Sequence, residues 1–138
     1  MKLTLEADYT LRIVSVLATR GVLTDAKKIS ESTAVTLRFT LKILHKLVKG
    51  GVAESHKGVN GGYKLRIAPD KITLKTIIEL VDGPIAISRC LNDTEVCSLN
   101  GVEKNSCAFH RAFKKVNDVL AEQLDAITIA DIISDSKN

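Results

Sequence analysis

Three cysteines and one histidine are the residues of this sequence whose types and spacing could support chemistry. They follow the pattern Cys90-x6-Cys97-x9-Cys107-x2-His110. Thiolates together with an imidazole suit an iron–sulfur cluster or a zinc ion. Zinc sites usually contain two cysteines about two to four residues apart, and that pair is absent, so the spacing favours a cluster. The alternative is three unrelated thiols, because the odd count argues only against a closed set of disulfides.

A thiol enzyme is the second chemistry that these residues allow. Cys107 and His110 are three residues apart, a spacing that puts both on one face of a helix. A nucleophilic cysteine also needs an orienting third group and donors that stabilise an oxyanion. The sequence contains no motif for either, so we expect a protein that is not an enzyme and has no small-molecule substrate.

A run of mixed apolar and basic residues predicts a helix with a basic ridge. Thr36 is the expected N-cap and Gly50 the expected end. Basic side chains on one helical face can neutralise phosphates, and an arginine can bind guanine through two hydrogen bonds. A solvated helix face is the alternative. The apolar stripe is Leu37, Leu41, Leu44 and Val48, widened by Ile43 and Leu47, and the ridge is Arg38, Lys42, His45 and Lys49, with Lys46 beside it.

A glycine-rich hairpin follows this helix. Residues 52–57 and 63–67 read as two strands joined by the turn KGVNGGY. Such a tip can approach DNA closely, with Lys57 near the backbone and Asn60 within reach of a minor groove. An ordinary hairpin loop is the alternative, but a basic helix followed by a hairpin favours nucleic acid. The helix and the hairpin both lie in the half of the chain that carries the basic charge. Residues 1–72 contain 13 Lys/Arg and 6 Asp/Glu, whereas residues 73–138 contain 7 Lys/Arg and 10 Asp/Glu.

The remaining patterns predict a mainly α fold with a small β-hairpin wing. A densely apolar helix is expected to end at Gly21, and Thr24 is the expected cap of the next helix. Thr73 and Thr128 are expected to cap two later helices. Three helices, a hairpin and further helices are the order of a winged helix-turn-helix protein. The expected helices lie at 5–18, 24–32, 36–50, 74–81, 106–125 and 129–133.

We divide the chain into three parts on this basis. Residues 1–82 form the winged helix-turn-helix DNA-binding domain, residues 83–106 a cysteine-bearing sensor loop, and residues 107–138 a long dimerisation helix with a tail. The long helix has an apolar stripe that lacks a partner in so small a domain, which suggests a two-fold homodimer. Packing back onto its own domain is the alternative. The expected dimer interface is Phe109, Phe113, Val116, Leu120 and Leu124.

Composition limits these interpretations. The chain has 138 residues, of which 45% are hydrophobic and 26% charged, with a formal net charge of +4. This length allows one core, and the composition is that of a folded protein, which argues against a multidomain enzyme and against disorder. No run approaches the ~18 apolar residues of a membrane span, and the first residues contain no leader-like apolar stretch. We therefore expect a cytoplasmic protein without membrane contact.

Several segments together resemble the Rrf2 family of bacterial winged-helix regulators. They are the opening MKLTLEADYTLR, the stretch LKILHKLVKGGVAESHKGVNGGYKL, the segment ITLKTIIELVDGPI and a cysteine soon after Gly83-Pro84-Ile85. The resemblance covers nearly the whole chain. It implies a homodimeric transcription factor that binds a pseudo-palindromic operator in double-stranded DNA. The residues expected to contact DNA are Thr36, Arg38, Phe39, Thr40, Lys42, Lys46, Lys57, Asn60, Gly61 and Gly62.

The resemblance also implies a cofactor, because members with three cysteines before the long helix commonly hold an iron–sulfur cluster there. Cys90, Cys97 and Cys107 match the ligands of a two-iron two-sulfur cluster, with a four-iron four-sulfur cluster as the other option. The fourth ligand is His110, which matches a histidine three residues after the last cysteine, or Asp8, which matches an acidic residue that the partner subunit contributes. From the residues alone, Asp8 also fits an ordinary acid in the first turn of a helix.

Such a regulator would sense redox state, nitric oxide or iron–sulfur status. A family member without a cluster, which acts by thiol oxidation or through a protein partner, is the alternative.

Overall fold

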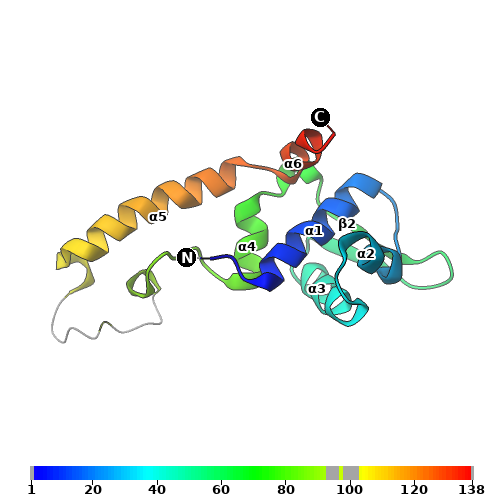
Figure 1. The fold of residues 1–138 in the computed structure, drawn as a ribbon, viewed down its shortest axis with the longest axis horizontal. Helices are drawn as coiled ribbons and strands as arrows, with labels where there is room; N and C mark the ends of the chain where they lie inside the picture. The colour runs from blue at the N-terminus through cyan, green and yellow to red at the C-terminus, as the bar shows by residue number, and fades with distance from the viewer. Residues whose placement is uncertain (1, 93–96, 98–102, 138) are drawn as a thin grey trace.

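The computed structural model describes residues 2–92, 97 and 103–137, so residues 93–96 and 98–102 of the expected sensor loop lie outside the described part. The described chain forms six α-helices and one two-stranded sheet (Figure 1). The prediction of a mainly α fold with a β-hairpin wing is confirmed. The elements are α1 (Leu5–Arg20), α2 (Ala26–Thr33), α3 (Leu37–Lys49), β1 (Ala53–His56), β2 (Gly62–Leu65), α4 (Leu74–Asp82), α5 (Ala108–Ala126) and α6 (Ile129–Asp135).

Side-chain caps fix where the helices begin. The Thr4 hydroxyl accepts a hydrogen bond from the backbone N–H three residues on (3.1 Å), and α1 ends where Gly21 takes the left-handed conformation (φ 65°). Thr36 caps α3 as predicted. The prediction was wrong for α2, whose cap is Asp25 rather than Thr24. Asp25 accepts from the backbone at the start of α2, which leaves the Thr24 backbone available for another partner.

Thr24 instead forms an isolated antiparallel β-bridge with Tyr63 of the wing. Its backbone N–H donates to the Tyr63 carbonyl (3.0 Å), and the Tyr63 N–H donates back to the Thr24 carbonyl (2.8 Å). β1 and β2 pair antiparallel, with Ala53 opposite Leu65. A Cβ at Gly62 would lie 2.6 Å from the Thr24 carbonyl oxygen, so glycine is required for this close approach. The wing is therefore tied, through the start of β2, to the connection between α1 and α2.

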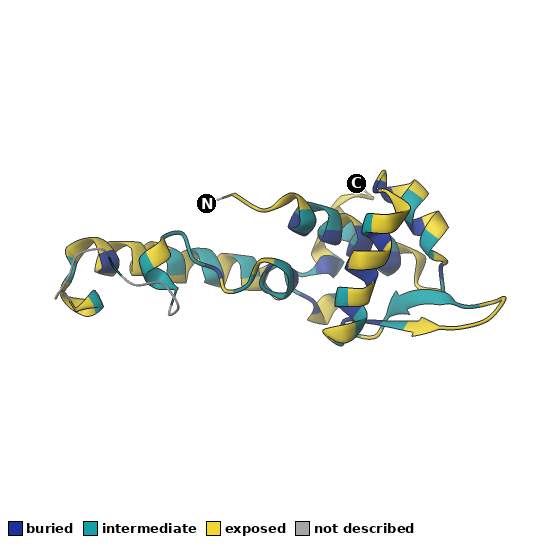
Figure 2. Cartoon of the chain, turned by 90° about the horizontal axis from the view of Figure 1, so that it is seen from below, coloured by how far each residue is buried: buried dark blue, intermediate teal, exposed yellow. Residues whose placement is uncertain are grey.

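The hydrophobic core lies between α1, α2, α3, α4 and α6 (Figure 2). On α3 the buried face matches part of the predicted stripe, because Ile43, Leu44 and Leu47 are buried. It differs at Leu37 and Leu41, which are 44% and 43% exposed, and at Thr40, which is buried. Each large apolar side chain contributes about 1.5–3 kcal/mol by leaving water. The core comprises Ile13, Val14, Leu17, Ile29, Ile43, Leu44, Leu47, Val52, Ala53, Ile72, Ile77 and Ile129.

The C-terminal helices behave differently from each other. α5 extends away from the helical bundle, whereas α6 returns to pack on α1 (Figure 1). Ile129 enters the core, and its backbone N–H donates to the Ile72 carbonyl (2.8 Å). Thr128 and Asp131 form a capping box that starts α6. The expected unit 107–138 therefore divides near Ile127, and α6 belongs with the winged-helix core. No described helix combines the length and apolarity of a membrane span.

Candidate functional site

The start of α3 presents an exposed surface that faces away from the core. Thr36 accepts a hydrogen bond from the Phe39 N–H (3.3 Å), and Arg38 is exposed. Phe39 packs edge-on against Tyr9 of α1 (centroids 5.5 Å apart), so its ring is held by the first helix. Thr40 corrects the predicted DNA-contacting set. Its side chain is 0% exposed, so it is a core residue and cannot reach DNA.

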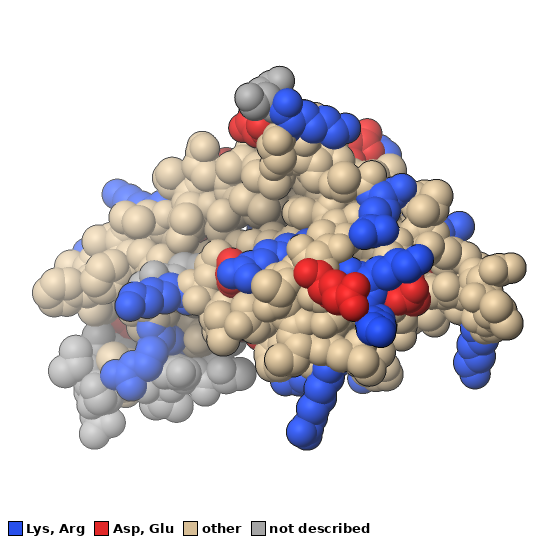
Figure 3. All heavy atoms as spheres, turned by 45° about the vertical axis from the view of Figure 1, so that its right-hand side comes forward, with Lys and Arg blue, Asp and Glu red and all other residues tan. Residues whose placement is uncertain are grey.

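The lysines of the predicted ridge have an acidic partner that sequence reasoning missed. Lys46 Nζ contacts one Glu6 carboxylate oxygen (2.5 Å), and Lys42 Nζ lies 3.7 Å from the other. Lys42 also lies over the Phe39 ring, 5.2 Å from its centroid. Acidic side chains lie among the lysines and arginines on the face in Figure 3. The ridge is therefore partly neutralised, with Arg38 as its exposed cation at the N-terminal end.

The wing has a neutralised base and an exposed tip. On the strands, Glu54 lies 3.3 Å from Lys64 and 3.4 Å from His56. The hydrogen bonds of Lys64 and then His56 to this carboxylate lower the pKa of Glu54 below its ordinary value. At the tip, Lys57 and Asn60 are exposed, which makes both accessible to a partner.

Close backbone packing explains why two adjacent glycines, Gly61 and Gly62, occur in the wing. A Cβ at Gly61 would lie 2.1 Å from the His56 carbonyl oxygen, and a Cβ at Gly62 would lie 2.6 Å from the Thr24 backbone. The glycines that suggested a DNA-contacting turn are therefore also required by the close packing of the wing. Val59, which the sequence reading did not select, projects fully exposed from the tip. An isolated valine in a glycine-rich turn is the signal that could have identified it.

Asn117 of α5 makes two hydrogen bonds to the segment before the first cysteine. The Asn117 Oδ1 accepts from the Ile87 N–H (2.9 Å), and its Nδ2 donates to the Ile85 carbonyl (2.9 Å). Three residues later, Cys90 Sγ lies 3.3 Å from the Ser88 hydroxyl. Asn117 therefore determines how the cysteine-bearing segment lies along the long helix.

Cys90 and His110 line one cavity of about 370 Å³ between this segment and α5. His110 is the single buried residue among those described on α5 (8% exposed), and its Nδ1 has no hydrogen-bond partner in the described chain. A buried imidazole nitrogen without a partner is costly unless a ligand satisfies it. Lys104, Lys114 and Asp118 also line the cavity, and Lys114 is paired with Asp118 (2.8 Å), so Lys104 is the cation of the wall without an acidic partner among the described residues that line it.

The other expected ligands, Cys97, Cys107 and Asp8, are not among the residues that line this cavity. Cys107 is half-buried and directly precedes α5, and Cys97 is half-buried between segments that are not described. Among the described residues, no group of three or more histidine, cysteine, aspartate or glutamate side chains is arranged to hold a metal. Asp8 is paired with Arg12 on α1 (2.7 Å), as expected of an acid in the first helical turn. Of the expected ligands, Cys90 and His110 therefore line the same cavity.

The predicted stripe of α5 is divided between exposed and half-buried residues. Phe109 and Phe113 are 73% and 41% exposed and stack with centroids 6.5 Å apart, and Val116 is 58% exposed. Leu120 and Leu124 are half-buried. Val119, also 58% exposed, was missed, although its position three residues after Val116 was the signal for it. An apolar surface of this kind on a protruding helix is typical of an interaction face.

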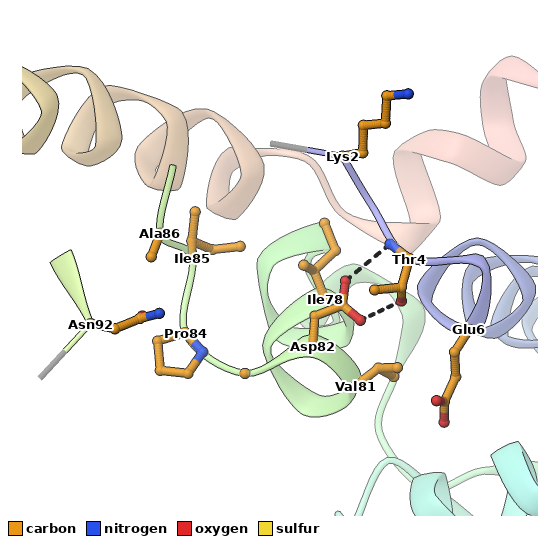
Figure 4. Close-up of a pocket in the computed structure, with 11 residues that line it drawn as sticks. Lys2, Thr4, Glu6, Ile78, Val81, Asp82, Pro84, Ile85, Ala86 and Asn92 are labelled. Atoms are coloured by element: carbon orange, nitrogen blue, oxygen red, sulfur yellow. Dashed lines mark hydrogen bonds between the residues drawn. The ribbon is translucent and has the colours of Figure 1, made fainter. Parts of the chain in front are cut away.

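A second cavity, of about 490 Å³, lies where α1, α4 and the segment after Gly83 meet (Figure 4). The Asp82 carboxylate accepts hydrogen bonds from the Thr4 N–H (3.3 Å) and hydroxyl (2.5 Å). Glu6 lines the same cavity, and its carboxylate extends from α1 toward α3. The N-terminal turn of α1 therefore contacts both α4 and the basic ridge of α3.

A capped basic helix, a glycine-dependent wing and a bundle that supports both define a winged helix-turn-helix protein. The model of the Rrf2 family, described as an iron-dependent transcriptional regulator, matches residues 3–135. The chain belongs to this family, so it is a transcriptional regulator that binds DNA and not an enzyme.

Individual relatives and structures agree with this assignment. The chain is 30% identical over 136 residues to the HTH-type transcriptional regulator NsrR of Bacillus licheniformis, a match that covers 96% of this chain and 92% of that protein. It is 28% identical over 109 residues to the regulator IscR of Aliivibrio salmonicida, covering 79% and 62%. The structure of CymR, the global cysteine regulator of B. subtilis, matches with a TM-score of 0.78 at 26% identity and covers 97% of both chains.

Proposed function

We propose that this regulator acts as a homodimer that reads a pseudo-palindromic DNA site. The observation that carries the proposal is the exposed apolar face of α5, formed by Phe109, Phe113, Val116 and Val119. A second copy would cover this face by two-fold symmetry and place two α3 helices at a fixed separation. In each copy, Arg38 would contact base edges while Lys57 and Asn60 of the wing reach the backbone and minor groove.

The dimer is tested by Phe113→Glu, which puts a charge in the centre of the apolar face. Light scattering coupled to size exclusion should give twice the chain mass for the wild type and the single-chain mass for the variant. Lys115→Glu, an exposed change on the same helix, is the matched control. A wild type with the single-chain mass at micromolar concentration would reject the homodimer.

We further propose that Cys90, Cys97, Cys107 and His110 hold an iron–sulfur cluster. The support is chemical: thiolates and an imidazole are cluster ligands, and the buried His110 Nδ1 lacks a partner while it shares a cavity with Cys90. When bound, the cluster supplies sensitivity to redox state. We favour His110 over Asp8 as the fourth ligand because Asp8 is already paired with Arg12.

The chain's own residues would transmit the state of this site. The cysteine-bearing segment is held to α5 through Asn117, so a shift of residues 85–90 would alter how α5 lies. Because α5 would form the dimer contact, that shift would change the separation of the two α3 helices. Half-site spacing is fixed by the DNA, so the separation controls affinity. A coupling of about 1–3 kcal/mol would be enough for a useful switch.

Iron and sulfide analysis of protein purified without oxygen tests the cluster. The wild type should contain iron and sulfide and absorb visible light, and His110→Ala should lose most of both. Asp8→Asn tests the other candidate ligand, and His56→Ala, on the wing, is the control for general effects of histidine removal. Iron-free wild-type protein would favour the second candidate, a regulator that senses through thiol oxidation or a protein partner.

A further inference from the structure

Glu6 is a partly buried acid of α1 whose carboxylate contacts two lysines of α3. Its side chain is 20% exposed, against 54% for Lys42 and 37% for Lys46, the two lysines that it contacts. These lysines lie 36 and 40 residues further along the chain, on the face of α3 that the proposed function turns toward DNA. One carboxylate therefore opposes two of the cations with which the protein would contact phosphates.

The contribution to folding stability is too small to explain why Glu6 contacts Lys42 and Lys46. An acid in the first turn of α1 is stabilised by the helix dipole, and Glu6 has that benefit wherever its carboxylate points. Ion pairs between partly exposed side chains contribute about 0–1 kcal/mol to stability, so the contacts to Lys42 and Lys46 add little. The more consequential effect of a carboxylate at this place is on the electrostatic potential of the DNA-facing helix.

We propose that Glu6 restrains the sequence-independent affinity of this regulator for DNA. Phosphate contacts supply nearly all of non-specific binding, because each neutralised phosphate releases condensed counterions. A lysine paired with Glu6 must exchange that carboxylate for a phosphate, and the exchange removes most of the gain. Arg38, which contacts no acid among the described residues, keeps its full capacity for base edges. Glu6 thus weakens the phosphate contacts that any duplex would make with Lys42 and Lys46, and it leaves the base contacts of Arg38 unaffected.

This inference rests on the proposed function, in which α3 faces DNA, and it is tested with a duplex that needs no known operator. Binding of the wild type and of Glu6→Gln to a labelled duplex of about 30 base pairs of mixed sequence is measured by anisotropy over a series of salt concentrations. The variant should bind about three- to tenfold more tightly at low salt. The slope of log K against log salt should become steeper by about one, as expected for one additional phosphate contact.

Two controls separate this effect from general charge and from folding. Glu31→Gln makes the same charge change at an exposed acid of α2 and should change affinity by less than about twofold. Removal of both lysines, Lys42→Gln with Lys46→Gln, should abolish the effect of a further Glu6→Gln change. Circular dichroism melting of every variant shows whether the fold is retained.

The outcomes distinguish the inference from the proposed function. Equal or weaker binding by folded Glu6→Gln, an unchanged salt slope, or an effect that persists without the lysines would overturn the role of Glu6. Wild-type protein that binds no duplex even at low salt would instead overturn the placement of α3 on DNA. A tighter and steeper variant, with the effect lost when both lysines are removed, supports both.

Discussion

Replacement of Asn117 by alanine should release the cysteine-bearing segment from α5 without unfolding the winged-helix domain. The side chain makes two partly buried hydrogen bonds of 2.9 Å, one from the Ile87 N–H and one to the Ile85 carbonyl. A hydrogen bond of this kind contributes about 0.5–1.5 kcal/mol, so the pair holds the segment by about 2 kcal/mol. That corresponds to roughly a thirtyfold change in the equilibrium for local opening.

Amide hydrogen exchange measures this opening directly. In Asn117→Ala, the Ile87 amide should exchange roughly thirtyfold faster than in the wild type, while the Leu44 and Leu47 amides of the core keep their protection. Asn117→Asp separates the two bonds, because the carboxylate still accepts from Ile87 but can no longer donate to Ile85. We therefore expect the Asn117→Asp variant to leave Ile87 largely protected.

The refuting result is specific. If the Ile87 amide exchanges at the wild-type rate in Asn117→Ala, Asn117 does not hold the segment, and the route proposed from the cysteines to α5 loses its physical basis. Equal acceleration by Asn117→Asp and Asn117→Ala would mean that Ile87 does not donate to the Asn117 oxygen.

Two further predictions concern the wing and α6. Gly62→Ala combines a strained φ of 144° with a Cβ placed 2.6 Å from the Thr24 carbonyl oxygen, so urea unfolding should show a loss of about 3 kcal/mol. Gly58→Ala, with a positive φ but open space, should lose about 1–2 kcal/mol; equal losses would mean that close packing at Gly62 is unimportant. Hydrogen bonds from the Thr128 N–H and then from its hydroxyl lower the pKa of Asp131. These bonds therefore stabilise the folded protein above the ordinary pKa of an aspartate, and this contribution is lost as the pH falls through the lowered pKa of Asp131. Thr128→Val removes the hydroxyl and should raise the pKa of Asp131 part of the way toward its ordinary value, and an unchanged NMR titration would contradict this assignment.

Local signals in the sequence predict the elements well because helix caps act over three residues. Thr36, Thr73 and Thr128 each accept a hydrogen bond from the third residue of the helix that they start, and each was predicted as a cap. Thr24 and Asp25 are adjacent residues that can both cap, so local chemistry could not choose between them. The pairing of Thr24 with Tyr63 decides the matter, and it lies 39 residues away in sequence.

The buried face of α3 was harder to predict for a related reason. Leucines and isoleucines occur on two overlapping arcs of this helix, and the periodicity does not show which arc meets the core. The structure buries Thr40 and exposes Leu37 and Leu41, because packing against α1 and α2 selects the arc. A polar residue at the centre of the buried arc is tolerated here since Thr40 Oγ1 lies within 3.5 Å of the Val35 carbonyl.

The candidate site was the hardest part to predict, because it is formed by contacts between residues that are far apart in the sequence. The cysteines and His110 are visible from spacing, but the burial of His110 and its unpaired Nδ1 follow only from the packing of α5 against the preceding segment. Glu6 and Asn117 were not predicted at all. Their partners lie 30 to 40 residues away, so an acid and an amide of ordinary type gave no local signal.

The base of α5 shows why small changes at the cysteine-bearing segment could have large effects in a dimer. Thr73 donates to Asp125 (3.0 Å), and the Leu74 N–H donates to the Ile127 carbonyl (2.9 Å), so the C-terminal end of α5 is anchored to the winged-helix domain. With 19 residues, the helix extends about 28 Å from this anchor at ~1.5 Å per residue. A tilt of about 5° at the anchor would therefore displace the far end, where His110 lies, by about 2 Å. The end of α5 near His110 would contact the second copy of the chain. A shift of the cysteine-bearing segment that tilts α5 would therefore rotate the winged-helix domain of each copy, and with it α3, relative to the other copy.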